Sequence, residues 1–206
     1  MSQFYDLCLR ETSEEMEKFA EELGWTATNC DFETVFLKAK DWGELKNKIN
    51  NNREQADVLV FEGGNAELNR KAAGSPKIDV LLHPEKDRKD SGIDHVIAEK
   101  AADNKVALGF DLQQLMESEK EQTHVLTAWR KNLRLCKKYE TPYIITSGAK
   151  KKLELRAPRE LAAILKSIGF KGNRAVSTTP KEILKRAEKV NKDGFIRPGE
   201  KVISDE

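Results

Sequence analysis

Five basic side chains follow one predicted β-strand at spacings that suit the binding of phosphate groups. They are Lys150, Lys151, Lys152, Arg156 and Arg159. The strand is expected over Tyr143–Thr146, and a helix is expected to begin at Pro158, so a helix N-terminus with free N–H groups lies among the cations. Lysine attracts phosphate as a point charge and arginine adds forked hydrogen bonds. The pattern predicts a surface for phosphate groups, and the alternative is a solvated basic face without a ligand.

The charge of the whole chain is divided unevenly along the sequence. Residues 125–206 carry 20 Lys and Arg against 9 Asp and Glu, whereas residues 1–69 carry 7 against 15, although the formal net charge is only +1. A basic region favours a nucleic-acid or membrane partner, because binding to phosphates releases condensed counterions. Apolar side chains beside the charges, which a membrane surface would need, are missing. We therefore expect RNA or DNA as the partner and no membrane.

Glycine, histidine and acidic residues follow several other predicted strands, at the end where parallel α/β folds place their ligand sites. These segments are Arg10-Glu11-Thr12, Glu62-Gly63-Gly64-Asn65, His83-Pro84-Glu85-Lys86, Asp111 and Ser147-Gly148-Ala149-Lys150. They could form an active site, or their glycines could simply turn the chain.

The residue types and their spacing give little evidence for a metal site or for a catalytic nucleophile. The histidines are His83, His95 and His124, of which we expect only the first at a strand end and the other two in helices on the outside of the fold. The three cysteines form no CxxC pair, so neither a zinc ribbon nor a disulfide framework is indicated, and we expect a reduced, cytoplasmic protein. No nucleophile elbow is present.

Short β-rich runs alternate with amphipathic stretches along most of the chain. The predicted strands are Phe4–Leu9, Trp25–Cys30, Thr34–Ala39, Asp57–Phe61, Ile78–His83, Val106–Phe110, Tyr143–Thr146 and Arg174–Ser177. The predicted helices are Ser13–Leu23, Trp42–Arg53, Asn65–Ala73, Ile93–Asn104, Thr123–Tyr139, Arg159–Ser167 and Pro180–Val190. This order predicts an α/β fold, a TIM-like (β/α)8 barrel in which one βα unit is abbreviated, since Cys30 to Thr34 leaves no room for a helix. An open doubly wound sheet is the alternative, weakened because no GxGxxG follows the first strand.

The domain organisation follows from the same patterns. We expect one α/β barrel domain over residues 1–190 and a charged, loosely ordered tail over residues 191–206. No apolar run is long enough to cross a membrane, and the N-terminus lacks the features of a signal peptide.

Several segments, taken together and in order, resemble one protein family. They are Phe4-Tyr5-Asp6-Leu7, Gly63-Gly64, Asn69-Arg70-Lys71-Ala72, Ile78-Asp79-Val80-Leu81-Leu82-His83-Pro84, Gly92-Ile93-Asp94-His95, Arg130-Lys131-Asn132-Leu133-Arg134-Leu135, Tyr143-Ile144-Ile145-Thr146-Ser147-Gly148-Ala149 and Leu155-Arg156-Ala157-Pro158-Arg159-Glu160-Leu161. They are similar to ribonuclease P protein component 3, the archaeal counterpart of the thirty-kilodalton subunit of nuclear ribonuclease P. The resemblance extends from residue 3 to about residue 190.

The resemblance implies a TIM-like barrel related to the polymerase-and-histidinol-phosphatase metalloenzymes, and a protein subunit around a catalytic RNA. Those enzymes carry paired histidines where this chain has Cys8 and Arg10. We therefore expect no catalytic centre, no metal and no cofactor in this chain, with Mg²⁺ serving the RNA of the holoenzyme. Ala157 stands where the family pattern suggests a serine that caps a helix.

The implied function is support of the 5′ maturation of precursor tRNA. The implied partners are ribonuclease P RNA, protein component 2 in a two-plus-two heterotetramer, other ribonuclease P proteins and, indirectly, precursor tRNA. Candidate RNA-phosphate contacts are Arg70, Lys71, Arg88, Arg130, Arg134, Lys150, Lys151, Lys152, Arg156 and Arg159. The alternatives are a metal-dependent phosphoesterase on the same barrel and a barrel enzyme that acts on a small phosphorylated metabolite.

Overall fold

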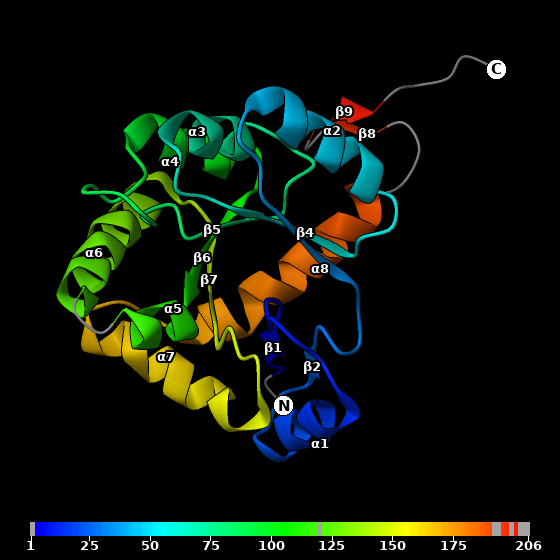
Figure 1. The fold of residues 1–206 in the computed structure, drawn as a ribbon, viewed down its shortest axis with the longest axis vertical. Helices are drawn as coiled ribbons and strands as arrows, with labels where there is room; N and C mark the ends of the chain where they lie inside the picture. Colours follow the sequence, from blue (N-terminus) through cyan, green and yellow to red (C-terminus); the bar gives the residue numbers. More distant parts are fainter. Residues whose placement is uncertain (1–2, 119–120, 191–194, 198–199, 202–206) are drawn as a thin grey trace.

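Parallel strands and helices alternate through the chain in a computed structural model that describes residues 3–118, 121–190, 195–197 and 200–201 (Figure 1). The strands are β1 (Tyr5–Asp6), β2 (Ala27–Thr28), β3 (Thr34–Leu37), β4 (Val58–Glu62), β5 (Val80–Leu82), β6 (Ala107–Asp111), β7 (Tyr143–Thr146), β8 (Phe195–Arg197) and β9 (Glu200–Lys201). The α-helices are α1 (Glu14–Glu22), α2 (Trp42–Asn52), α3 (Ala66–Ala73), α4 (His95–Asp103), α5 (Leu112–Glu117), α6 (Gln122–Tyr139), α7 (Pro158–Ser167) and α8 (Thr178–Val190). Two 3-10 turns, η1 (Lys152–Glu154) and η2 (Asn173–Val176), lie on either side of α7.

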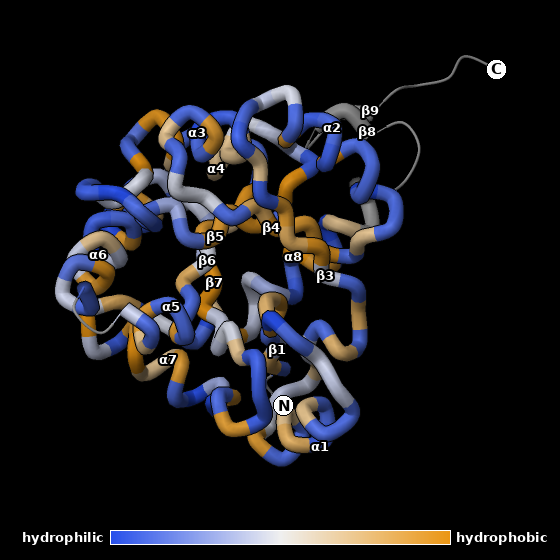
Figure 2. Tube along the Cα trace, viewed as in Figure 1, coloured by the Kyte–Doolittle hydropathy of each residue, from blue (hydrophilic) through white to orange (hydrophobic). Residues whose placement is uncertain are grey.

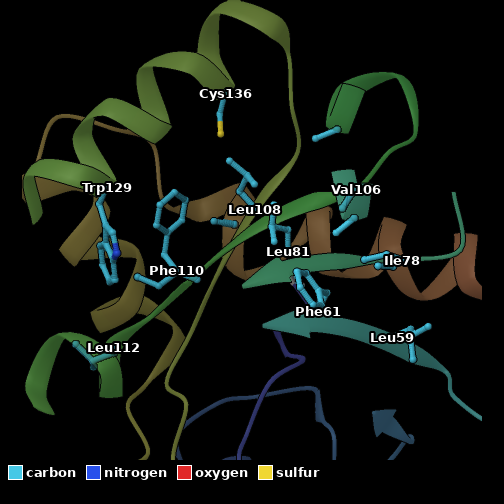
Figure 3. Packing of buried hydrophobic residues seen from close by; sticks show 14 of the residues in the cluster. Leu59, Phe61, Ile78, Leu81, Val106, Leu108, Phe110, Leu112, Trp129 and Cys136 are labelled. Atoms are coloured by element: carbon cyan, nitrogen blue, oxygen red, sulfur yellow. The ribbon is translucent and has the colours of Figure 1, made fainter. Parts of the chain in front are cut away.

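A five-stranded parallel sheet in the order β3-β4-β5-β6-β7 forms the centre of the fold. Every residue of β4, β5 and β6 is buried, which explains why these strands are apolar without alternation. Figure 2 shows the hydrophobic residues concentrated along these central strands. On the helix-covered face, Phe61, Leu81 and Leu108 pack beneath the helices (Figure 3), and Phe110 meets Trp129 of α6 edge to face at 5.2 Å between ring centroids.

The other face of the sheet packs against the N-terminal segment and α8. Val60, Val80 and Leu82 form a separate apolar cluster with Leu7, just after β1, and with Ile183 of α8. The Asp6 carboxylate accepts hydrogen bonds from the Thr146 hydroxyl and from the Ser147 N–H (2.9 Å) and hydroxyl (2.7 Å). Side chains thereby join β1 to the β7 edge of the sheet, while β1 itself pairs in parallel with β2.

The N-terminal segment also reaches the opposite edge of the sheet. The Thr34 hydroxyl, at the start of β3, donates a hydrogen bond of 3.0 Å to the Leu7 carbonyl. Burial raises the pKa of Asp6, although the hydroxyl and amide donors around it act in the opposite direction. Asp6 of β1 and Leu7 directly after it therefore contact the two edge strands of the central sheet.

Seven of the eight predicted strands overlap a strand of the structure, and the eighth is wrong. Residues 174–177, predicted as a strand, form most of the turn η2 instead, which packs against β7. Only Ala175 and Val176 of this run are buried. Two adjacent apolar residues are compatible with one buried helical turn as well as with a buried strand, so the hydrophobic pattern could not distinguish the two structures.

The predicted helices are present, with ends that follow their capping residues. The Ser13 hydroxyl accepts the Met16 N–H at 3.3 Å at the start of α1, and Gly24 and Gly169 adopt left-handed conformations after α1 and α7. Helix α5 is absent from the prediction. Part of the predicted tail forms the antiparallel pair β8–β9, and the remainder, residues 191–194, 198–199 and 202–206, lies outside the described residues. In the part of the chain described, no helix is long and apolar enough to cross a membrane.

Candidate functional site

A cavity of about 490 Å³ lies where the carboxyl ends of the strands meet. Residues that follow β1, β4, β5, β6 and β7 line it, as the sequence predicted. Those predicted lining residues are Arg10, Glu11, Glu62, His83, Glu85, Lys86, Asp111, Gly148 and Lys150. The parallel arrangement brings them together because successive strands point the same way and their ends converge on one edge.

The Arg10 guanidinium is at the centre of the polar network in this cavity. Arg10 Nη1 pairs with the Glu62 carboxylate, and Nη2 lies 2.6 Å from His83 Nε2 and 3.3 Å from Asp111 Oδ2. The guanidinium carbon also lies 4.6 Å from the centre of the Phe36 ring, in cation–π geometry. One side chain after β1 thus contacts β3, β4, the end of β5 and the end of β6.

The charges of the network support one another despite their burial. Burial would raise the pKa of Glu62, but Arg10 and Lys38, whose Nζ lies 3.1 Å from Glu62 Oε2, hold it below its usual value. Burial would lower the pKa of Arg10, but Asp111 and Glu62 outweigh it and raise that pKa. The guanidinium remains charged and offsets the negative charge of two buried carboxylates, Glu62 and Asp111.

Glu85 is a third buried carboxyl group in the cavity wall, and only one of its oxygens has a hydrogen-bond partner among the described residues. Glu85 lies two residues after His83, in the segment that follows β5, and it is 3% exposed. Its Oε1 accepts a hydrogen bond of 3.2 Å from the Trp129 indole N–H. Among the residues that the structure describes, Oε2 has no hydrogen-bond partner. Burial raises the pKa of Glu85.

Gly148 allows the β7 end to approach the network closely. Its φ is +63°, and a Cβ at this position would lie 1.8 Å from Asp111 Oδ1. The glycine therefore turns the chain, as one of the two sequence interpretations held, and it also makes room for a carboxylate of the site.

The residues at this site do not suit a metal ion. Within the described ranges, no three His, Cys, Asp or Glu side chains are arranged to hold one. Arg10 contributes a fixed positive charge between Glu62 and Asp111, and this charge repels a metal cation from the two carboxylates. His95 lies exposed at the start of α4 and His124 lies in α6, so both are in helices as predicted. His124 also borders the cavity, with Nε2 2.9 Å from the Arg88 carbonyl oxygen.

Half of the ten candidate phosphate contacts are engaged within the chain. Arg70 pairs with Asp94 at 3.2 Å and Arg88 with Asp90 at 2.6 Å. Lys150 pairs with Glu117 at 2.6 Å, Lys152 pairs with Glu15 at 3.1 Å, and Arg156 donates to the Leu153 and Leu155 carbonyls. The acidic helix α1 therefore lies beside the basic segment, a neighbourhood that residue counts along the sequence could not show.

The other five candidates form no ion pair in the part of the chain described. They are Lys71 on α3, Arg130 and Arg134 on α6, Lys151 before η1 and Arg159 on α7, and all are exposed. Lys71 Nζ lies 5.6 Å from the centre of the Trp42 ring. The ten residues do not occupy one element: α3 lies at one end of the molecule and the η1–α7 segment at the other (Figure 1).

Sequence reasoning missed three residues that complete the site. Lys38 reaches Glu62 from the end of β3, Gln114 of the unpredicted α5 contacts His83, and Trp129 comes from α6. No local pattern identified them, because each joins the site only through tertiary packing. Trp129 carried one usable signal: a buried indole needs an acceptor for its N–H.

The sheet and the network together define a parallel α/β protein whose strand-end site is built around an arginine. Comparison with known proteins then gives the family. Residues 31–192 match the family described as RNase P subunit p30. The chain belongs to this family, whose archaeal members are named ribonuclease P protein component 3.

Two curated relatives and one solved structure illustrate the similarity. The chain is 31% identical over 201 residues to ribonuclease P protein component 3 of Methanococcus maripaludis strain S2, covering 95% of this chain and 85% of the relative. It is 32% identical to component 3 of Methanococcoides burtonii, covering 89% and 88%. A chain in a cryo-EM structure of archaeal ribonuclease P with mature tRNA superposes with a TM-score of 0.74 at 28% identity, covering 100% of this chain and 90% of that one. This protein is therefore a subunit of ribonuclease P, the holoenzyme that processes the 5′ end of tRNA.

Proposed function

We propose that the chain supports ribonuclease P by binding the catalytic RNA through phosphate contacts, while catalysis takes place in the RNA. The observation that carries the proposal is the similarity over the whole chain to a component of an archaeal ribonuclease P assembly that contains tRNA. The exposed cations of α6 and of the η1–α7 segment supply the matching chemistry, because contacts to phosphate add affinity without base preference.

The proposed contacts are the ten basic residues named from the sequence. Lys71, Arg130, Arg134, Lys151 and Arg159 should contribute most, since no carboxylate in the described part of the chain neutralises them. Arg70, Arg88, Lys150 and Lys152 would first have to leave Asp94, Asp90, Glu117 and Glu15. Arg156 is held by backbone carbonyls.

We further propose that the two parallel sheets complete a TIM-like barrel. Support for this comes from the contacts of Asp6 with Thr146 and Ser147 and of Leu7 with Thr34, which join the β1 segment to the β7 end and to β3. The apolar cluster of Leu7, Val60 and Ile183 would fill its interior.

We also propose that the chain binds no cofactor, that Mg²⁺ serves the RNA, and that the protein is cytoplasmic.

The proposed protein partner is ribonuclease P component 2, in a two-plus-two assembly, with other ribonuclease P proteins completing the complex. Precursor tRNA would be contacted indirectly. The phosphoesterase alternative loses support, because the Arg10 guanidinium bonds the carboxylates that a metal would need.

Reconstitution tests the proposal. Cognate ribonuclease P RNA should process precursor tRNA faster with this chain and component 2 together than with component 2 alone. The purified chain without RNA should cleave neither precursor tRNA nor phosphate esters, with or without divalent metal. Metal-dependent cleavage by RNA-free protein that Arg10→Ala enhances would instead support the phosphoesterase.

A further inference from the structure

The loop between β5 and α4, residues 83–94, is pinched at its base by one buried side chain. The amide of Asn69 on α3 donates to the Pro84 carbonyl at 2.9 Å and to the Gly92 carbonyl at 2.8 Å. The two ends approach so closely that a Cβ at Gly92 would lie 1.8 Å from the Pro84 carbonyl oxygen. Residues 85–91 therefore form a loop whose base is fixed.

Three side chains of α6 hold residues 85–91 against that helix. The contacts are His124 Nε2 with the Arg88 carbonyl (2.9 Å), the Trp129 indole with Glu85 Oε1 (3.2 Å) and the Asn132 amide with the Ser91 carbonyl (2.8 Å). We call this set the loop–α6 contact. Part of the same segment, Glu85, Lys86, Asp87 and Arg88, also borders the cavity. The loop is thus a wall of the cavity that α6 holds in place.

The loop–α6 contact is poorly satisfied. Among the described residues, three buried side-chain atoms lack a hydrogen-bond partner, and two of them, Glu85 Oε2 and Asn132 Oδ1, belong to this contact. A buried polar atom without a partner destabilises the arrangement that buries it. His83 and Asp87, two positions before and after Glu85, have φ values of +52° and +56°, which strain a residue with a side chain. These features make the contact one of the parts of the fold that open most easily.

The charge of Glu85 decides how costly the contact is. A protonated Glu85 still accepts the Trp129 indole N–H and carries no charge into the interior. An ionised Glu85 would be a buried carboxylate with one described donor for its two oxygens, and such a charge favours any arrangement that exposes it to water. Burial accordingly raises the pKa of Glu85, although His83 acts in the opposite direction.

Titratable and charged groups from each neighbouring element border the same cavity. They are Arg10 after β1, His83 after β5, Asp111 at the end of β6, Glu117 of α5, Glu121 before α6 and His124 of α6. Arg10 pairs with Asp111, and Glu117 pairs with Lys150. In the loop itself, Lys86 is exposed and Arg88 pairs with Asp90. None of these contacts supplies a donor to Glu85 Oε2 among the described residues.

We propose that the loop–α6 contact is a pH-sensitive gate on the cavity. With Glu85 protonated, residues 85–91 lie against α6. When Glu85 releases its proton to solvent, the segment moves away from α6 about the base that Asn69 holds, the carboxylate becomes hydrated, and the cavity widens on this side. The gate is a property of this chain alone and does not depend on the proposed function.

Hydrogen–deuterium exchange of the full chain, read by mass spectrometry, tests the gate. Glu85→Gln keeps an acceptor for the Trp129 indole and cannot ionise. Wild type and variant are compared at each pH, so that the intrinsic effect of pH on exchange cancels. The ratio of wild-type to variant exchange in residues 85–91 should rise by up to about tenfold per pH unit above the ordinary carboxyl value of 4.5, and should level off above the raised pKa. Peptides from α4 should exchange equally in both proteins.

Two further variants separate ionisation from packing. Glu117→Gln is the matched control: it removes another carboxyl group that borders the cavity, but an exposed one paired with Lys150, and should behave as wild type. Asn132→Ala removes a second tie to the loop without changing the charge, and should speed exchange of residues 85–91 at every pH. Wild-type exchange in Asn132→Ala at acidic pH would show that α6 does not hold the loop and would overturn the gate.

The pH profile decides the rest. A wild-type to Glu85→Gln ratio that stays constant with pH would overturn the gate, because packing and not ionisation would then determine the difference. A rise that appears equally in α4 would assign the effect to unfolding of the whole domain and would overturn it as well. If Glu85→Gln does not fold, wild type alone is sufficient: after correction for intrinsic rates, exchange of residues 85–91 should rise with pH relative to that of α4, and parallel profiles would refute the proposal.

Discussion

Arg10 Nη2 lies 2.6 Å from His83 Nε2, and the same ring nitrogen lies 3.2 Å from Asp111 Oδ2, so His83 stands beside both the cation and one of its carboxylate partners. On the other side of the ring, His83 Nδ1 lies 2.5 Å from Gln114 Oε1. Held from both sides, His83 keeps a backbone φ of +52°, a conformation that a non-glycine residue retains only when its surroundings enforce it.

Replacement of the central cation should destabilise the fold strongly. Arg10→Met removes the cation that Glu62 and Asp111 share but keeps an apolar stem against Phe36, so Asp111 loses its arginine partner and Glu62 is left with Lys38. We expect a loss of about 3–5 kcal/mol in the free energy of unfolding, measured by urea denaturation at neutral pH. Arg10→Lys, which keeps the charge but not the fork, should lose less.

The pH dependence of this loss has a definite sign. The pKa of Glu62 is depressed in the folded protein, so its contribution is present above its ordinary value of 4.5 and disappears as pH falls through the depressed value. The difference between wild type and Arg10→Met should therefore shrink on acidification below about pH 4.5. A difference that stays constant from neutral pH down to about pH 3 would contradict the ion network as the source of stability.

Gly148 should tolerate no side chain. In Gly148→Ala the Cβ would collide with the Asp111 carboxylate and would also require a positive φ, so we expect a loss of roughly 2–4 kcal/mol by thermal or urea unfolding. Gly169→Ala is the matched control: its φ is +93°, but nothing lies within 4 Å of the added Cβ. It should cost about 1 kcal/mol. Equal losses in the two variants would show that backbone strain, not the approach to Asp111, determines the effect.

Much of the fold was predictable because local signals coincide with it. Ser13 caps α1, Gly24 closes it, and the apolar run of β4 is buried on both faces. The strand-end residues Arg10 and His83 meet because parallel strands end together. The turn η2 and the helix α5 escaped prediction, since each is too short to show a period.

The partners of the charged residues were not predictable, because they depend on which surfaces the fold brings together. The pair Lys152–Glu15 joins residues 137 positions apart in sequence. Residue counts separated an acidic N-terminal region from a basic C-terminal region, but the fold places α1 beside η1. Likewise, Arg10 was recognised as a poor metal ligand, whereas its role as the cation between Glu62 and Asp111 needed the structure.

Neutralisation of Glu85 should stabilise the protein at higher pH. Because burial raises the pKa of Glu85, its favourable contribution is complete below the ordinary value of 4.5 and is lost as pH rises through the raised value. Glu85→Gln keeps an acceptor for the Trp129 indole and cannot ionise. Its denaturation midpoint should exceed that of wild type more at about pH 8 than at about pH 5. Glu117→Gln, where Lys150 lowers the pKa of the wild-type carboxyl, should show no such gain.

A serine at the start of α7 should complete an existing cap. The Ala157 N–H already donates to Glu160 Oε2 at 2.8 Å, which is half of a capping box, but alanine offers no acceptor to the helix. Ala157→Ser should accept the Glu160 N–H and raise the free energy of unfolding by about 1 kcal/mol. An unchanged urea midpoint would mean that the carboxylate of Glu160 alone already satisfies this end of the helix.

The final prediction compares two pairs of basic residues in RNA binding. Arg130 and Arg134 are exposed on α6 without an ion pair in the described part of the chain, whereas Lys150 and Lys152 are paired with Glu117 and Glu15. A phosphate contact contributes about one unit to the slope of log affinity against log salt. Arg130→Ala with Arg134→Ala should therefore flatten the slope for cognate RNA by up to about two units. Lys150→Ala with Lys152→Ala should change it less, because those lysines must first leave their carboxylates.

Both double variants should unfold near the wild-type midpoint, since exposed charges contribute little to stability. Glu14→Gln with Glu21→Gln on α1 is the control and should leave the slope nearly unchanged. A larger change of the slope in the lysine variant would contradict this prediction and would show that the residues beside η1 contribute more to RNA binding than those of α6.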